Sequence, residues 1–268
     1  VSSPGIDVEM LADIGKHYSE IVSDPHKPMF NRAVQAPYPP GSVFKLVNGL
    51  IGLEEGVLKP EYTYPCNKGY YFGSHKLGCH AHRSPLNLEE AIMMSCNGYF
   101  CYVMKNILEN RKYSSPGEAL DKWHDYVQSF GLGRKLGSDF PAELGGTLPT
   151  SAYYNRIYGK NGWKFTTVIS ISIGQGEIGV TPLQIANMCA IVANRGHYYI
   201  PHIIKDYDFV IDGTDNFPAK FLINDACVMA KKPFSHAGII RFKGQLMTYV
   251  PGQGPCYRCV FKNPPPKD

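Results

Sequence analysis

Ser42 and Lys45 are the two residues whose types and spacing are best suited to chemistry. Residues three apart lie on one face of a helix, so the Lys45 amine can reach the Ser42 hydroxyl and, when neutral, take its proton. A serine activated in this way attacks carbonyl carbon and forms an acyl-enzyme. Apolar residues at helical spacing run from Phe44 to Leu53, and Gly56 follows them as a helix-ending residue. This pattern predicts a helix that starts at Ser42 and Lys45. Its N-terminus would offer free N–H groups to an oxyanion.

A second polar pair, Ser95 and Asn97, lies further along the chain. The two residues could do no more than cap the next helix, just as Ser42 and Lys45 alone could be a solvated pair. Their order, with S-x-x-K followed by S-x-N, instead favours one joint site for acyl transfer.

Several helices must position these pairs. Asn87, followed by Glu90, is typical of a helix start, and a second helix is predicted over Tyr99–Leu108. Downstream, Thr181 with Pro182 predicts another capped helix, which Gly196 ends, and residues 198–204 are predicted to leave it as a strand. One further apolar stripe at helical spacing is expected only to fill the core. It consists of Trp123, Tyr126, Val127 and Phe130.

From Val1 to about residue 205, the chain resembles the transpeptidase domain of elongation-type class B penicillin-binding proteins (penicillin-binding protein 2), such as those of Bacteroidetes. The resemblance rests on both motifs and on the stretches Phe130-Gly131-Leu132-Gly133, Ser172-Ile173-Gly174-Gln175-Gly176 and Thr181-Pro182-Leu183-Gln184. It implies D,D-transpeptidation of peptidoglycan stem peptides through an acyl-serine, reaction with β-lactams and no cofactor for this reaction.

The resemblance also implies residue roles. Ser42 would be the nucleophile, Lys45 the base, Ser95 a proton relay and Asn97 the contact for the substrate amide. A turn near the cleft is expected at Gly174, Gln175 and Gly176.

The third motif of that family, K-T-G, occurs nowhere in the chain; the nearest string is Phe242-Lys243-Gly244-Gln245. In the family this strand walls the active site, completes the oxyanion hole and binds the substrate carboxylate. We therefore expect most of the family's central sheet to be missing and any transpeptidase activity to be weak.

From Asp206 the pattern changes to a short strand up to Asp212, a helix over residues 218–231 and strands around Ile239 and Leu246. This segment resembles part of the ThiF and MoeB type of adenylyltransferase, on the stretches Asp212-Gly213-Thr214-Asp215-Asn216, Asn224-Asp225-Ala226-Cys227, Ala237-Gly238-Ile239-Ile240-Arg241-Phe242 and Gly254-Pro255-Cys256-Tyr257-Arg258-Cys259. By position, Asp215 corresponds to the aspartate that binds magnesium and ATP, and Cys256 with Cys259 to the first half of a structural zinc site. The glycine-rich phosphate loop and the second C-x-x-C are not found, the latter being expected beyond Asp268.

We accordingly predict an α+β chain. Residues 1–205 would form the mainly helical part of a penicillin-binding transpeptidase fold, and residues 206–268 a partial Rossmann-like segment. Three functions remain open: a transpeptidase, an adenylyltransferase of a sulfur-carrier protein that uses Mg-ATP, and a catalytically dead chimera. The junction near Lys205 is consistent with a natural fusion, an assembly artefact or a designed chain.

A cluster of possible metal ligands, Cys66, Cys79, His80 and His82, falls in a Gly- and Tyr-rich loop between the two motifs. A C-x12-C-H-x-H string can wrap a tetrahedral zinc, which would clip a loop without helical or strand periodicity. Cys96 could be a further ligand. A Cys66–Cys79 disulfide, or reduced cysteines beside surface histidines, would also fit the sequence.

Composition limits the classes of partner. The 268 residues are 44% hydrophobic with a net charge of +4 and scattered basic residues, which argues against a nucleic-acid surface. No run of ~18 apolar residues and no signal peptide is found, so we expect no membrane segment. The transpeptidase resemblance implies the periplasmic side of the inner membrane and cell-elongation membrane proteins as partners; the adenylyltransferase alternative implies the cytoplasm.

Overall fold

The structure is a computed structural model that describes residues 5–6, 10, 13–140, 142–160, 162–202, 208–213, 217–240 and 243–261. The chain divides into two compact units. The larger unit comprises Ala33–Leu136 and Ala142–Tyr199, and the smaller unit comprises Val1–Arg32, Gly137–Pro141 and Ile200–Asp268. Together, their described elements form a mixed α+β fold, as the sequence predicts.

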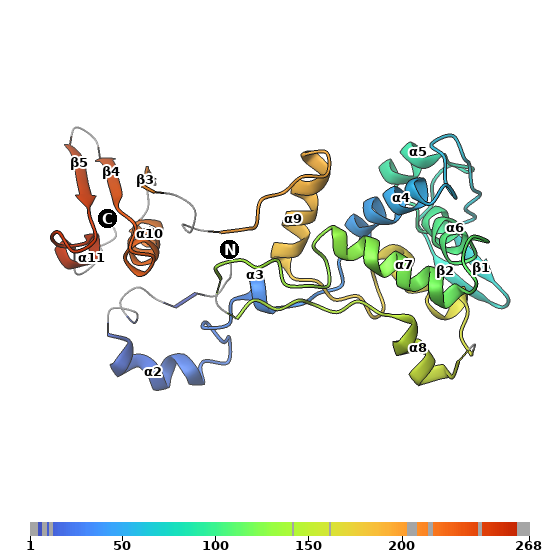
Figure 1. The fold of residues 1–268 in the computed structure, drawn as a ribbon, viewed down its shortest axis with the longest axis horizontal. Coiled ribbons are helices and arrows are strands. Elements are labelled where there is room, and N and C mark those ends of the chain that lie inside the picture. Colours follow the sequence, from blue (N-terminus) through green and yellow to red (C-terminus); the bar gives the residue numbers. More distant parts are fainter. Residues whose placement is uncertain are drawn as a thin grey trace. The chain divides into compact units, whose positions relative to one another are not determined.

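The larger unit is mainly helical (Figure 1). Its helices and strands, in chain order, are α3 (Arg32–Gln35), the 3-10 turn η1 (Gly41–Val43), α4 (Phe44–Glu54), β1 (Gly69–Phe72), β2 (His75–Gly78), α5 (Leu88–Met93), α6 (Asn97–Leu108), α7 (Pro116–Ser129), α8 (Ser151–Tyr158), the 3-10 turns η2 (Phe165–Thr167) and η3 (Ile169–Ile173), and α9 (Pro182–Ala193).

Helix α6 is the centre of this unit. It contacts α4, α7, η3 and β1, and most of its residues are buried: Gly98, Tyr99, Phe100, Cys101, Val103, Met104, Ile107 and Leu108. A helix that is apolar on nearly every side is stable only when other elements surround it. This packing fixes the start of α4 relative to the start of α6. The S-x-x-K and S-x-N motifs lie at these two helix starts.

The helix caps agree with the sequence. Asn87 and Glu90 form a reciprocal capping box at the start of α5, and Thr181 with Gln184 forms one at the start of α9. Each box satisfies two N–H groups that would otherwise lack a partner. Gly196 follows α9, as predicted, with its N–H donating to the Ile191 carbonyl.

Asn48 on α4 joins three elements of the core and is fully buried. Its Nδ2 donates to the Ser172 carbonyl at 3.0 Å, and its Oδ1 accepts from Trp123 Nε1 at 2.8 Å. The amide therefore connects α4 to η3 and α7, one helical turn after Lys45.

We predict that Asn48→Ala destabilises the chain, because the Trp123 N–H and the Ser172 carbonyl would stay buried without their partner. Leaving such groups unsatisfied costs about 2 kcal/mol or more, which corresponds to a fall of about 5 °C in Tm for a unit of this size. Thermal unfolding followed by circular dichroism measures this. The exposed residue Asn67 supplies the matched control, Asn67→Ala. Equal Tm values for the two variants would show that the buried amide has no structural role.

The loop between the two motifs is more ordered than the sequence predicts. Strands β1 and β2 pair as an antiparallel hairpin, with Gly69 opposite Gly78 and Phe72 opposite His75. The prediction of a segment without strands was wrong here, because four-residue strands are too short for alternation to show. The hairpin delivers Gly78 and Cys79 to the start of α6.

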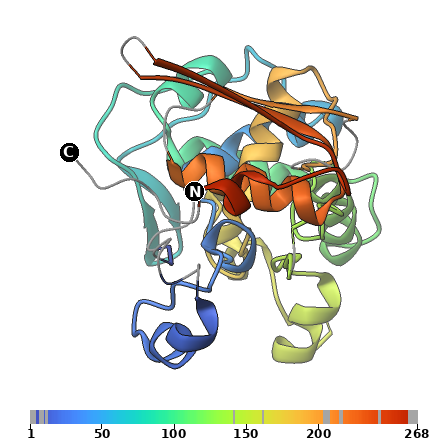
Figure 2. The same ribbon diagram turned by 90° about the vertical axis from the view of Figure 1, so that its left-hand side faces the viewer.

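The smaller unit contains α2 (Ile14–Ser23) and a C-terminal α/β segment: β3 (Val210–Asp212), α10 (Phe217–Met229), β4 (Phe234–Ile240), β5 (Lys243–Tyr249) and α11 (Tyr257–Val260). The sheet order is β3-β4-β5, with β3 parallel and β5 antiparallel to β4. Helices α10 and α11 lie along one face of this sheet (Figures 1 and 2). Its core consists of Phe221, Cys227, Phe234, Tyr249 and Tyr257.

On the opposite face of this sheet, Ile211 and Leu246 are 80% and 77% exposed. The sequence also predicts a strand over residues 198–204; this is wrong for Tyr198–His202, which have no strand structure, and the remaining two residues lie outside the described residues. Apolar residues in a short connection resemble a strand when only local pattern is considered.

Candidate active site

Both predicted motifs meet at the Lys45 amine. Ser42 lies in η1 and Lys45 in the first turn of α4, and Lys45 Nζ is 3.1 Å from Ser42 Oγ. The same nitrogen is 3.0 Å from Ser95 Oγ, 2.7 Å from the Ser95 carbonyl and 2.6 Å from Asn97 Oδ1. The structure thus brings all four predicted catalytic side chains together around one amine.

The atoms around Lys45 Nζ can accommodate a neutral amine. The Ser95 carbonyl and Asn97 Oδ1 can only accept hydrogen bonds, so they take two N–H groups. A neutral amine then has one lone pair left, which can accept the Ser42 hydroxyl proton across 3.1 Å. This arrangement is the one that a general base for Ser42 requires.

Burial of Lys45 favours the neutral form of its amine. Lys45 is 3% exposed, and this desolvation lowers the pKa of its amine, although neighbouring cysteine sulfurs act oppositely. A charged ammonium is costly in such surroundings, so the neutral form is more populated than for a lysine in water.

Ser95 has a strained backbone. It lies between α5 and α6 with a φ of 48°, in the left-handed region that residues other than glycine rarely adopt. Cys96 then caps α6, its sulfur accepting from the Tyr99 N–H. The conformation turns both the Ser95 carbonyl and its hydroxyl toward Lys45, and such strain is typical of functional sites.

The predicted turn at Gly174, Gln175 and Gly176 lies next to η1. The Gly41 N–H donates to the Gly174 carbonyl at 2.9 Å. Gly174 has a φ of 70°, and a Cβ atom there would come within 2.4 Å of the Gly41 carbonyl oxygen. Only glycine allows this approach, so the turn supports the start of the Ser42 helix.

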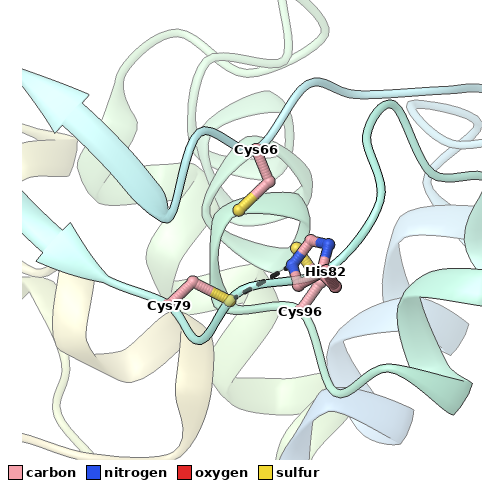
Figure 3. Close-up of side chains that lie close together, drawn as sticks. All are labelled: Cys66, Cys79, His82 and Cys96. Carbon is pink, nitrogen blue, oxygen red and sulfur yellow. Dashed lines mark hydrogen bonds between the residues drawn. The ribbon is translucent and has the colours of Figure 1, made fainter.

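Cys66, Cys79, His82 and Cys96 converge beside this site (Figure 3). Their ligand atoms all lie within 4.8 Å of one another, and His82 Nε2 is 3.4 Å from Cys79 Sγ. His80, predicted from the sequence as a ligand, lies outside this set of four: its side chain is exposed, with Nδ1 4.0 Å from Cys79 Sγ. Cys96 takes its place because capping α6 turns its sulfur inward.

The donor chemistry of this cluster fits a metal ion. His82 Nδ1 lies 2.6 Å from the Arg83 carbonyl, to which it donates, so the Nε2 lone pair is free to face the sulfurs. Burial alone would raise the pKa of the Cys79 thiol, but N–H donors from Asn97 and Gly98, with His82, lower it. Three cysteines and one histidine are a common tetrahedral set for zinc.

The cluster and the catalytic residues share Asn97. Its backbone N–H donates to Cys79 Sγ at 3.2 Å, and its Nδ2 donates to the Gly78 carbonyl at 2.8 Å. These contacts orient the amide so that Oδ1 faces Lys45. This support from the hairpin is not predicted by the sequence, in which the position of Cys96 inside S-x-N is the one hint of it.

Of the residues predicted for adenylation and its zinc half-site, only the two cysteines lie in the described part of the chain. Asp215 lies outside the described residues. Cys256 and Cys259 have their sulfurs 3.4 Å apart at α11. Among the described residues, the four ligands shown in Figure 3 form the only group of three or more metal-binding side chains, so no third donor stands at Cys256.

Comparisons with known proteins identify one family over most of the chain. Residues 9–253 match the penicillin binding protein transpeptidase domain. The peptidoglycan D,D-transpeptidase MrdA of Acinetobacter baumannii is 33% identical over 214 residues, covering 76% of this chain and 30% of that protein. A second similarity, covering 25% of this chain and 15% of the relative, is 51% identity over 67 residues to the adenylyltransferase and sulfurtransferase MOCS3 of Drosophila sechellia.

Solved structures of penicillin-binding proteins also align with this chain. Pseudomonas aeruginosa PBP2 in complex with WCK 5153 aligns with a TM-score of 0.63 and 29% identity, over 75% of this chain and 44% of that chain. PBP2 of Helicobacter pylori in complex with MreC aligns with a TM-score of 0.60 and 28% identity, over 71% and 34%. The chain therefore spans less than half the length of these relatives. Within the described part of the chain, none of the helices has the length and apolar content to cross a bilayer.

Proposed function

This chain belongs to the penicillin-binding protein transpeptidase family, and from that premise we propose that it is a peptidoglycan D,D-transpeptidase-like protein whose nucleophile is Ser42. The observation that carries the proposal is the set of contacts around Lys45 Nζ, which links Ser42, Ser95 and Asn97 through one buried amine. A solvated or merely structural lysine would not need two hydroxyls and two carbonyl oxygens around it.

The proposed reaction begins with proton transfer. Lys45 takes the Ser42 proton, and Ser42 Oγ attacks the carbonyl carbon of the penultimate D-alanine of a stem peptide. Ser95 Oγ, 3.0 Å from the same amine, returns the proton to the leaving D-alanine nitrogen. An amine of a second stem peptide then attacks the acyl-enzyme and releases Ser42.

Asn97 would orient the substrate in this scheme. Its amide nitrogen carries two N–H groups, of which one donates to the Gly78 carbonyl. The other can donate to a backbone carbonyl of the stem peptide, as the family resemblance implies. Gly174 would support the rim of the same site through its contact with Gly41, and Gln175 and Gly176 continue the same turn.

We propose that the activity is weak, because the sequence contains no K-T-G. Losing one oxyanion donor typically slows acyl transfer by ~10² to 10³. Slow covalent labelling by a fluorescent penicillin tests the proposal, with turnover of stem peptide expected to be below detection. Labelling that persists in Ser42→Ala would show that the nucleophile lies elsewhere.

We predict that the rate of β-lactam acylation rises with pH. Because burial lowers the pKa of Lys45, the amine loses its proton, and becomes able to act as a base, at lower pH than an ordinary lysine. The rate should therefore be low where Lys45 is protonated, rise through its lowered pKa and level off above it. Rates of fluorescent-penicillin labelling between about pH 6 and 10 measure this; a rate that does not change with pH would contradict the role of Lys45 as base.

We propose that Cys66, Cys79, His82 and Cys96 bind one structural zinc ion. Zinc bound there would supply a fixed link between the β1–β2 hairpin and the start of α6. The link would hold Asn97 against Cys79 and Gly78, and thereby the Oδ1 contact to Lys45. In this proposal the metal takes no part in acyl transfer.

The wider assignments follow the family. Since the Helicobacter pylori relative is solved with MreC, we propose an MreC-type protein and other cell-elongation membrane proteins as partners. We propose stem peptides and β-lactams as ligands. The proposed location is the periplasmic side of the inner membrane. We also propose the boundary near residue 205 as the junction of the two similarities, although the transpeptidase match extends to residue 253.

An adenylyltransferase is the second candidate, because 25% of the chain is 51% identical to MOCS3. We expect no adenylation by this chain. Phosphate binding in such enzymes needs a glycine-rich turn at a helix N-terminus, which the sequence lacks, and a lone Asp215 would repel phosphate without magnesium. Exchange of labelled pyrophosphate into Mg-ATP should therefore equal the blank. Exchange that Asp215→Ala abolishes would establish the adenylyltransferase.

A further inference from the structure

A cavity of about 510 Å³ lies in the larger unit. It is bounded by α7, by the start of α8, by the loop that joins these two helices and by the segment that follows the Gly174 turn. The residues of the proposed acyl-transfer scheme do not line it. Sites for small molecules have volumes of roughly 300–1,000 Å³, so the cavity has the size of a ligand site.

Short contacts hold the walls of this cavity in place. Thr147 and Gly179 exchange two backbone hydrogen bonds, of 2.7 and 3.0 Å. Asp121 on α7 accepts from the N–H of Ser151, at the start of α8, at 2.8 Å. Gly146 has a φ of 73°, and a Cβ atom there would lie 2.4 Å from the Gly179 carbonyl oxygen, so only glycine allows this close approach. Because the walls are already formed, a ligand has little ordering cost to overcome.

Glu177 supplies a charged hydrogen-bond acceptor to the cavity. Its Oε2 accepts from the Tyr154 hydroxyl at 2.8 Å, and Tyr154 is fully buried. Burial and the neighbouring Glu177 carboxylate both raise the pKa of Tyr154, so its hydroxyl keeps the proton and remains the donor. This contact orients the carboxylate and leaves its second oxygen, Oε1, able to accept from a ligand.

Tyr153 gives the cavity an aromatic wall. Its ring meets the Tyr154 ring at 79°, with the centroids 5.2 Å apart, and the Arg156 guanidinium lies 5.9 Å from its centre. These two neighbours fix the orientation of the ring. Leu148 and Pro149 add apolar carbon to the same lining. The C–H face of a sugar ring packs on such an aromatic wall, and an acetyl methyl group packs against aliphatic carbon.

The polar groups of the cavity distinguish between classes of ligand. Glu177 brings a negative charge, and the described residues that line the cavity include no lysine or arginine, which disfavours phosphate and carboxylate ligands. An ammonium group could pair with Glu177, but it only donates hydrogen bonds and fills little of the volume. His124 and Thr147 can donate as well as accept. A neutral sugar with several hydroxyls matches both the size and this mixture of donors and acceptors.

From this cavity we propose a second binding site, outside the acyl-transfer site, for N-acetylated hexose rings of a peptidoglycan strand; that source of the sugar rests on the proposed function. A sugar hydroxyl donates to Glu177 Oε1, and the ring packs on Tyr153. Glu177 is three residues after Gly174, whose carbonyl accepts from the Gly41 N–H beside Ser42. A strand held in the cavity stays attached to the chain between acyl-transfer events, which raises the effective concentration of its stem peptides.

The test titrates a soluble tetramer of N-acetylglucosamine into the full chain by isothermal titration calorimetry. Cellotetraose, which has the same rings without acetamido groups, is titrated in parallel. We expect saturable binding of the acetylated tetramer and weaker binding of cellotetraose. Glu177→Gln should weaken binding by about tenfold or more, because it removes a charge-assisted hydrogen bond. Tyr153→Ala should weaken it by about tenfold, because it removes the aromatic wall.

Two matched controls keep the cavity intact. Tyr158→Ala removes a half-exposed tyrosine of α8 that does not line the cavity, and Asp125→Asn removes an exposed carboxylate beside His124 in sequence. Both variants should bind the tetramer like the parent. Circular dichroism checks that all four variants are folded.

Fluorescent-penicillin labelling of the same samples separates this proposal from the proposed function. Tyr153→Ala should label at the parental rate. Sugar binding without labelling of the parent would contradict the proposed function but not the cavity site. No binding of the acetylated tetramer, or binding that Glu177→Gln and Tyr153→Ala leave unchanged, would overturn the cavity site whatever the labelling shows. Equal affinity for cellotetraose would overturn peptidoglycan as the source of the sugar.

Discussion

Lys45→Met should abolish acylation by β-lactams while leaving the chain folded. Methionine matches the apolar stem of lysine but cannot take the Ser42 proton, and losing a general base typically slows a reaction by ~10² to 10⁴. Because activity without K-T-G is already expected to be weak, this loss should bring labelling to the background. The measurement is the rate of fluorescent-penicillin labelling, with circular dichroism to check the fold.

Two variants control for charge and position. Lys105→Met removes a partly exposed lysine of α6 that faces Glu109 at 3.8 Å, and it should label like the parent. Lys45→Arg keeps the positive charge but cannot deprotonate in a protein, so it should be as inactive as Lys45→Met. Labelling of Lys45→Arg at the parental rate would show that Lys45 acts through its charge and not as a base.

Zinc content should depend on the cluster beside the S-x-N motif. The purified, reduced parent should contain about one zinc per chain, since three thiols and one imidazole form a complete tetrahedral set. A Cys79→Ser, His82→Ala double variant should contain markedly less and should also lose penicillin labelling, because Cys79 accepts the Asn97 N–H. Elemental analysis and labelling of the same samples measure both effects.

His80→Ala is the matched control for this prediction. His80 neighbours Cys79 in sequence but its side chain is exposed, so the variant should keep both zinc and labelling. Equal zinc in the parent and the double variant would remove Cys66, Cys79, His82 and Cys96 as a ligand set. Zinc loss in a Cys256→Ser variant would instead locate the metal at α11.

The features that sequence predicts best here are local ones. The helix caps predicted at Asn87 and Thr181 are confirmed, because a cap and its partner are three residues apart. The apolar strands predicted around Ile239 and Leu246 likewise depend on a short window, and both are confirmed as β4 and β5. Helix α6 begins at Asn97, two residues before the predicted start, because Cys96 supplies a cap that residue preferences do not anticipate.

What the sequence does not predict depends on contacts between distant segments. Asn48 appears in the sequence only as a polar residue within an apolar helix, and its partners Trp123 and Ser172 are far along the chain. Cys96, and not His80, lies with Cys66, Cys79 and His82 because the β1–β2 hairpin brings Cys79 to the start of α6. Spacing suggested that the catalytic residues act together, but only the fold brings Ser95 and Asn97 to Lys45.

The central claim, acylation at Ser42, has one direct test. The chain is incubated with benzylpenicillin, digested with trypsin and mapped by mass spectrometry. Cleavage after Arg32 and Lys45 gives peptide 33–45, which contains Ser42 as its one serine and no cysteine. We predict the mass of one penicilloyl group on this peptide, located on Ser42 by fragmentation and absent from Ser42→Ala. An adduct on any other peptide, or an unmodified peptide 33–45 after prolonged incubation at saturating penicillin, would contradict the account.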